Sequence, residues 1–194
     1  MAREYRNAML ISPDEVKAIS QVNYNVQDDT IGYAIRTAQE IYLNEIIGTA
    51  LYYRLQELVY NAIVGNEDNI DAAANVEYAV LLDEYITPYL VAKSAVECLM
   101  PLSFKVRNLG VTKDSDTNVN AVNIDELKYV ITYNETQVAE YATRISQFLY
   151  RNKENYVELN DCTACGEKKA QIGRKYANTP LFIGNNNGCK SKCN

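Results

Sequence analysis

The chain has 194 residues, a net charge of −6 and 47% hydrophobic residues, which suits one sizeable core with an appendage. It contains no histidine, which excludes Ser-His-Asp and Cys-His catalysis and every metal site that uses imidazole. No apolar run approaches the roughly 18 residues that a membrane span needs, and the N-terminus lacks a signal-peptide pattern, so we expect a soluble protein.

A short capped helix is predicted near the start of the chain. Ser12 can accept a hydrogen bond at a helix N-terminus, Pro13 fits the first turn, and Glu15 stands where it completes a capping box. A polar bend then leads to Asp28 and Asp29, whose carboxylates suit the free amides and the dipole at the start of a second helix. We therefore expect a helix–bend–helix unit in this part of the chain.

Two amphipathic helices follow, and a glycine is expected to end each of them, Gly48 and then Gly65. Apolar residues recur every three or four positions before each glycine, which predicts one buried stripe per helix. In the second helix the stripe comprises Ile31, Ala34, Ile35, Ala38, Ile41, Tyr42 and Ile46. In the third helix it comprises Leu51, Leu55, Leu58, Val59, Ala62 and Ile63.

A buried central helix and a long closing helix are predicted farther along the chain. Residues 75–103 are apolar on most sides, as in a central helix, and Pro88 should kink or split it. Cys98 lies in this run and is interpreted as a small buried hydrophobe. Asn123 and Glu126 form a cap-like pair that opens the closing helix. Its packing positions are Leu127, Ile131, Asn134, Val138, Tyr141, Ile145 and Phe148.

Between these two helices lies a polar stretch, Lys105 to Val122, that has no aromatic residue and no helical stripe. At about 18 residues it exceeds the usual connection in a compact domain, so it either has a function or lacks fixed structure of its own. The sequence thus predicts an all-α fold: a small helical bundle with a long polar loop and a Cys-rich C-terminal tail. We place the helical domain at residues 1–157 and the tail at residues 158–194.

Four of the five cysteines stand in this tail: Cys162, Cys165, Cys189 and Cys193. A Cys-x-x-Cys pair followed by glycine has the shape of a zinc knuckle, and two such pairs can supply four thiolates to a tetrahedral Zn²⁺. Lysines nearby would offset the negative charge of such a centre. Four thiolates close the coordination shell, so the predicted zinc is structural. Free thiols and two disulfides are the alternatives, and disulfides would need an oxidising compartment.

The chain has 16 tyrosines and no tryptophan. Tyrosine combines apolar area with a polar tip, which suits surfaces that become buried in an assembly as well as the rim of a core. We expect Tyr52, Tyr53 and Tyr60 to lie on helix faces that the core does not use, where they would meet neighbouring subunits.

No pattern in the sequence indicates catalysis. Adjacent carboxylates such as Asp83 and Glu84 point in different directions on a helix, so they do not form acid–base pairs. A glycine-rich phosphate loop and a Gly-x-Ser-x-Gly nucleophile turn are both absent from the sequence. We therefore expect a protein that is not an enzyme.

The layout as a whole resembles a known family. Its parts are the capped SPDEV helix, an amphipathic helix that runs into IIGTALYYRLQEL, central apolar helices, the polar RNLGVTKDSDTNVNAV loop and a closing helix with DELKYVITYNETQVAEYATRISQFL. In this order they look like the head–tail connector (adaptor, or ring) proteins of tailed bacteriophages, most like those of crAss-like phages. The resemblance covers about residues 10–155 and leaves the cysteine tail unmatched.

The resemblance implies a bundle that assembles as a ring of about twelve copies beneath the portal of the virion. One face would dock the portal protein, and the other would receive tail proteins or other connector proteins. The polar loop would approach the DNA channel or a neighbouring subunit. DNA would pass without sequence-specific binding, because an acidic body repels phosphates. No membrane would be involved, and assembly would take place in the host cytoplasm.

One alternative belongs to a different class of function. The protein would then be a cytoplasmic helical adaptor whose zinc-binding, basic tail contacts nucleic acid or a protein partner. The positive charge of the tail supports this alternative, whereas a ring within the assembled particle would favour the connector.

Overall fold

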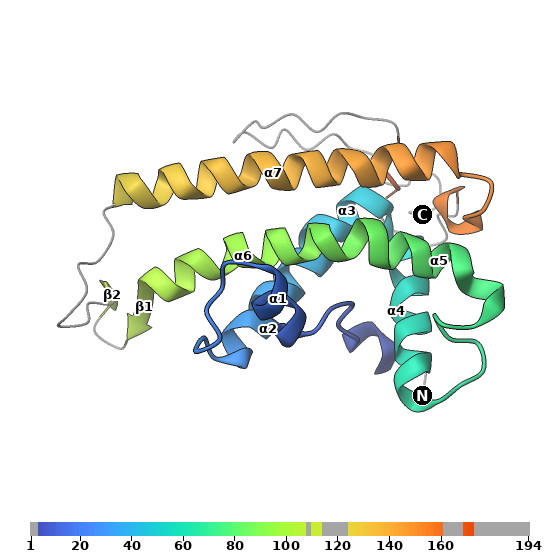
Figure 1. The fold of residues 1–194 in the computed structure, drawn as a ribbon, viewed down its shortest axis with the longest axis horizontal. Coiled ribbons are helices and arrows are strands. Elements are labelled where there is room, and N and C mark those ends of the chain that lie inside the picture. Colours follow the sequence, from blue (N-terminus) through green and yellow to red (C-terminus); the bar gives the residue numbers. More distant parts are fainter. Residues whose placement is uncertain (1–3, 108–109, 114–123, 161–168, 173–194) are drawn as a thin grey trace, which may run out of the picture.

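The computed structural model describes residues 4–107, 110–113, 124–160 and 169–172. In these residues the protein is a small all-α bundle, as the sequence predicts, with one short β-hairpin (Figure 1). The helices α6 (Thr87–Ser103) and α7 (Ile124–Arg151) run side by side in opposite directions, and α2 (Asp28–Thr37) packs against α6. None of the described helices is both long and apolar enough to cross a membrane.

The first helix has the cap that its sequence predicts. α1 (Pro13–Ile19) begins after Ser12, whose Oγ accepts a hydrogen bond from the Glu15 amide at 3.2 Å. The Glu15 carboxylate accepts in return from the Ser12 amide at 2.6 Å, which completes the capping box. Val16 on the inner side of this helix is fully buried.

Glycines end the next two helices, as predicted. Gly48 has φ 82°, and Gly65 adopts the left-handed conformation with φ 77° and ψ 28°. Residues other than glycine rarely adopt positive φ values. Gly65 follows α4 (Thr49–Val64). The helix before Gly48 has three parts: α2, the π-helical stretch η2 (Ala38–Leu43) and α3 (Asn44–Ile47).

The π-helical stretch moves the buried stripe of this helix by one residue, because its turns are wider than α-helical turns. Gln39 and Leu43 are therefore buried, whereas Ile41 and Tyr42 are 53% and 37% exposed. The predicted stripe was wrong for Ile41 and Tyr42, since it assumed a regular α-helical period. In α4 the prediction was wrong for Ile63, which lies in the last turn of the helix and is exposed.

Two buried glutamines attach the N-terminal segment to the bundle. This segment includes the 3-10 helix η1 (Glu4–Asn7). The Gln39 side chain accepts from the Leu10 amide at 3.1 Å and donates to the Ala8 carbonyl at 3.1 Å. Gln56 of α4 donates to the same carbonyl at 3.0 Å. A buried amide side chain is tolerated here because backbone groups pair with it.

The central helix passes Pro88 without being split, which corrects that part of the prediction. It consists of η3 (Ala73–Asn75), α5 (Val76–Val80), the π-helical η4 (Leu81–Ile86) and α6. Proline has no amide hydrogen, so one carbonyl in the preceding turn loses its helical partner. The turn before Pro88 is widened instead of broken, and the Thr87 amide donates to the Leu82 carbonyl five residues back.

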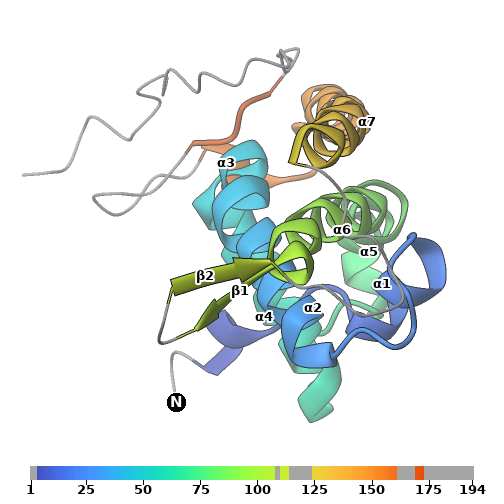
Figure 2. The ribbon, with the colours of Figure 1, turned by 90° about the vertical axis from the view of Figure 1, so that its left-hand side faces the viewer.

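A β-hairpin replaces the first part of the predicted polar loop. β1 (Phe104–Arg107) pairs antiparallel with β2 (Gly110–Lys113), and Val106 stands opposite Val111. The order polar–apolar–polar at the start of this stretch has the period of a strand, so it carries no helical stripe. The hairpin projects from the helical body (Figure 2). The rest of the predicted loop, residues 114–122, lies outside the described residues.

The core extends past the predicted domain boundary at residue 157. Tyr156 is fully buried, and Leu159 in the 3-10 helix η5 (Val157–Asn160) is 1% exposed. Farther on, the Gln171 amide donates to the Ile46 carbonyl at 2.9 Å, and the Ser146 hydroxyl donates to the Gln171 carbonyl at 2.6 Å. These described parts of the tail therefore belong to the bundle, because apolar burial and backbone pairing hold them there.

Candidate assembly surface

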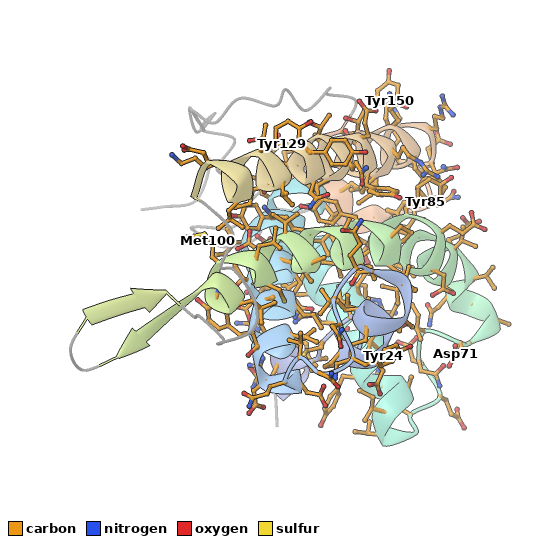
Figure 3. The ribbon with its side chains drawn as sticks, turned by 60° about the vertical axis from the view of Figure 1, so that its left-hand side comes forward. Tyr24, Asp71, Tyr85, Met100, Tyr129 and Tyr150 are labelled. Atoms are coloured by element: carbon orange, nitrogen blue, oxygen red, sulfur yellow. The ribbon has the colours of Figure 1, made fainter. Side chains whose placement is uncertain are left out.

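Exposed apolar side chains gather at the end of the bundle from which the hairpin projects. On α7, Tyr129, Val130 and Tyr133 are 75%, 40% and 58% exposed. On α6, Met100 and Leu102 are 53% and 39% exposed. Since α6 ends where α7 begins, all five residues lie at one end of the pair, as the positions of Met100 and Tyr129 show in Figure 3. We call these five residues the hairpin-end surface.

The helical period places the two tyrosines of this surface on the outside. Tyr129 and Tyr133 are four residues apart and share one ridge of α7, while Leu127 and Ile131 turn toward α6. Farther along the helix the same outer side carries polar residues: Gln137, Glu140, Arg144 and Gln147. The outer side of α7 is therefore apolar in its first turns and polar through its middle, and an exposed tyrosine, Tyr150, returns only in the last turn.

A buried ion cluster fixes α7 against the rest of the bundle. Lys93 of α6 is 3% exposed, and its Nζ lies 2.6 Å from Glu135 Oε1 of α7 and 2.9 Å from Glu97 Oε1. The same Nζ lies 3.8 Å from the ring centroid of Tyr42, a cation–π contact with η2. One ammonium group thus joins three helices, and two carboxylates balance its charge.

Lys93 and Cys98, two buried groups of α6, both have raised pKa values, so both are held in their protonated forms. Burial alone would lower the pKa of Lys93, but the hydrogen bonds to Glu135 and Glu97 outweigh it, so the pKa is raised and the amine stays charged. Burial and, to a smaller extent, the charge of the nearby Glu97 raise the pKa of the Cys98 thiol to about 11. Cys98 is fully buried, as the sequence predicts.

The opposite end of the molecule carries a second polar network, in the link between α4 and α5. Arg54 pairs with Asp68 at 3.1 Å and with Glu57 at 3.0 Å. Asn75 donates to the same Asp68 carboxylate at 2.8 Å, and Asn61 donates to the Asp68 carbonyl at 2.7 Å. The link is therefore held in one shape by several hydrogen bonds.

The three tyrosines predicted as interface residues have different surroundings. Tyr52 is 2% exposed and packs in the core, where its hydroxyl lies near Gln39 and Glu40 of η2, so its assignment to a free helix face was wrong. Tyr53 is half-buried, and the Arg6 guanidinium lies 4.4 Å from its ring centroid. Tyr60 is also half-buried. An interface role for Tyr53 and Tyr60 stays a prediction.

The four cysteines predicted as zinc ligands, Cys162, Cys165, Cys189 and Cys193, lie outside the described residues. Within the part of the chain that the structure describes, no three His, Cys, Asp or Glu side chains are close enough to hold a metal ion. The described segment 169–172 stands between the two cysteine pairs in the sequence. Besides its backbone bonds, Gln171 donates to the Glu45 carboxylate at 3.1 Å.

Sequence reasoning did not single out the hairpin-end surface or Lys93. A signal for Tyr129 and Tyr133 exists, because both stand off the predicted packing positions of α7 and are therefore left on its outer side. Lys93 carries no comparable signal. A lysine in an apolar helix can lie at the surface or be buried with partners, and its partner Glu135 stands 42 residues away.

Comparison with known proteins identifies a family. A search of curated proteins finds no match, and neither does a search of solved structures. A family model matches residues 43–169, which include the bundle from α3 onward and the first cysteine pair. The match covers well over half of the chain. The protein therefore belongs to DUF6712, a family of unknown function.

Proposed function

We propose that this protein is a structural subunit of the head–tail connector of a tailed bacteriophage, and that its copies form a ring between portal and tail. The observation that carries the proposal is the hairpin-end surface. Exposed apolar side chains that gather on one end of a folded domain mark places where other proteins bind. Tyrosine and methionine, which are enriched at such contacts, supply three of its five residues.

The stiffness of the bundle at this end supports an assembly role. The first turns of α7 carry the tyrosines, and the Lys93–Glu135 pair holds the helix within the next two turns. An interface loses less free energy on binding when its groups are already ordered in the free protein. A fixed α7 would therefore present Tyr129 and Tyr133 in the same position on every copy.

The charge of the protein supports a ring around DNA. The whole chain has a net charge of −6, and residues 161–194 contain six basic and two acidic residues, so the remaining residues have a net charge of −10. An acidic bundle repels phosphates at short range, so DNA would move through a ring of such subunits without adhering to it.

Replacing Tyr129 and Tyr133 by serine is expected to weaken assembly at least tenfold, since each loses a large apolar ring at a contact. Sedimentation of the purified protein over a range of concentrations, with negative-stain images of the largest species, would measure this. Tyr24→Ser is the matched control, because Tyr24 is 70% exposed but lies on the bend between α1 and α2. Rings should persist in the control.

A protein that stays monomeric at every concentration and is absent from purified virions would contradict the connector. Salt-dependent DNA binding by that monomer would instead favour the adaptor with a basic tail.

We propose also that the four tail cysteines bind one structural zinc. Metal analysis of protein purified without chelator is expected to give about one zinc per chain, and Cys162→Ser should abolish it, because three thiolates bind zinc less tightly than four. Cys98→Ala is the matched control, since Cys98 is buried in the core and far from the tail in sequence. Metal-free protein with reactive thiols in the folded state would refute the proposal.

A further inference from the structure

The β-hairpin offers unpaired backbone and positive charge at one end of the molecule. Among the described residues β1 and β2 pair only with each other, so each strand leaves one edge open. The two strands carry Lys105, Arg107 and Lys113 and no acidic residue, and Asp114 and Asp116 come only after β2 has ended. A two-stranded hairpin that projects from its domain is marginally stable unless something packs against it (Figure 2).

The opposite end of the molecule has the complementary chemistry. The link between α4 and α5, residues 65–75, contains Glu67, Asp68 and Asp71 and no basic residue. Glu67 and Asp71 are exposed, and Asp71 lies at the far end of the molecule from the hairpin (Figure 3). The exposed apolar residues that flank this link are Ile63, Val64 and Val76. We call residues 63–76 the acidic link.

The acidic link is also ordered before any partner binds. The Asp68 side chain is held by Arg54 and Asn75, and the Ile70 amide donates to the Leu58 carbonyl at 3.2 Å. Hydrogen bonds to Asn75 and Arg54 lower the pKa of the Asp68 carboxyl, so its charge is kept. An ordered, charged surface needs little reorganisation to receive an oppositely charged element.

We infer that the hairpin of one copy docks on the acidic link of the next copy. The inference rests on the proposed ring and names the contact that would build it. The partner is a second copy because each chain carries both complementary surfaces, at opposite ends, where one molecule cannot bring them together (Figure 1). A contact between two unlike surfaces is head-to-tail, which closes into a ring when the rotation per subunit allows it.

The first test exchanges charge between the two surfaces. Variant one carries Lys105→Glu and Arg107→Glu, which make the hairpin acidic. Variant two carries Glu67→Lys and Asp71→Lys, which make the link basic. Asp68 is left unchanged, because its bonds to Arg54 and Asn75 fix the conformation of the link. Each variant alone should need a roughly ten- to hundredfold higher concentration to assemble, because like charges then face each other. An equimolar mixture should assemble as the unaltered protein does, since every hairpin again meets a link of opposite charge.

Matched controls are Asp14→Lys and Arg36→Glu, on exposed positions of α1 and α2 away from both ends. Both should assemble normally. If the two variants assemble as readily as the unaltered protein, the inferred docking contact is wrong, but the proposed ring is not contradicted. If the unaltered protein never assembles, the proposed function and the contact are both wrong.

A second test needs no variant. Carbodiimide treatment of the assembled, unaltered protein joins lysines to carboxylates that are in direct contact. Mass spectrometry should then identify peptides in which Lys105 or Lys113 is joined to Glu67 or Asp71. Cross-links found only between other pairs, in protein that has assembled, would overturn the inference.

Discussion

Replacing Tyr156 by alanine is expected to lower the free energy of unfolding by about 3–5 kcal/mol, the usual range for removing a fully buried aromatic ring. Tyr156 is 0% exposed, and its ring packs edge-on against Tyr78 with centroids 5.4 Å apart. The ring of Phe148 in α7 also meets the Tyr156 ring edge-on, with the two centroids 6.4 Å apart. The substitution leaves a cavity where the chain after α7 meets α5, and this cavity destabilises the fold. Urea unfolding followed by circular dichroism would measure the decrease in the free energy of unfolding.

Two further variants separate the contributions to this effect. Tyr156→Phe should lose only about 1 kcal/mol, because it keeps the ring and removes the hydrogen bond that the hydroxyl donates to the Glu77 carbonyl at 2.8 Å. Tyr150→Ala is the matched control near the end of α7. Tyr150 is 61% exposed and points away from the body in Figure 3, so its loss should change stability by less than about 0.5 kcal/mol. A similar loss for Tyr150 and Tyr156 would contradict the packing described above.

Replacing Lys93 by methionine is expected to destabilise the protein by about 2–3 kcal/mol. Removing one partner of a fully buried ion pair typically costs about 3–5 kcal/mol, because the other charge stays buried without compensation. The side chains of Glu97 and Glu135 are 25% and 36% exposed, so water would recover part of this loss. Methionine keeps the apolar stem, which isolates the charge as the variable in a denaturation experiment.

The control for this experiment is an exposed ion pair on α7, the helix that carries Glu135. Lys128 is 71% exposed and lies 3.7 Å from Asp125, so Lys128→Met should change stability by less than about 0.5 kcal/mol. Adding Glu97→Gln and Glu135→Gln to Lys93→Met should restore much of the lost stability, because no buried charge then lacks a partner. If Lys93→Met behaves like Lys128→Met, the cluster does not hold α7.

These two residues hold α7 at different places, with different consequences for assembly. Tyr156 fixes the chain that follows the end of α7, whereas Lys93 holds the helix near Glu135, next to the turns that carry Tyr129 and Tyr133. We therefore expect the Lys93 variant to impair ring formation more than a Tyr156 variant of equal stability does. The hairpin-end surface depends on the orientation of the first half of α7.

Local sequence signals determined where the helices begin and end. The Ser12 cap, the glycines at 48 and 65 and the packing positions of α7 act within one or two turns, so their effects need no knowledge of the fold. The same local reasoning missed the π-helical phase shift at η2 and the hairpin. In both cases the number of residues per turn or per side-chain repeat differs from that of an α-helix, and the spacing of apolar residues in a short segment does not reveal such a difference.

Sequence alone thus determined an all-α bundle, its helix ends and the inner side of α7, because each of these follows from contacts between near neighbours in the chain. Only the tertiary structure decided which tyrosines face solvent, since Tyr52 is buried and Tyr129 is exposed although both stand in amphipathic helices. It alone also joined Lys93 to Glu135 across two helices and placed the hairpin and the acidic link at opposite ends (Figure 1). Burial and pairing between distant residues depend on how helices pack, which no local pattern encodes.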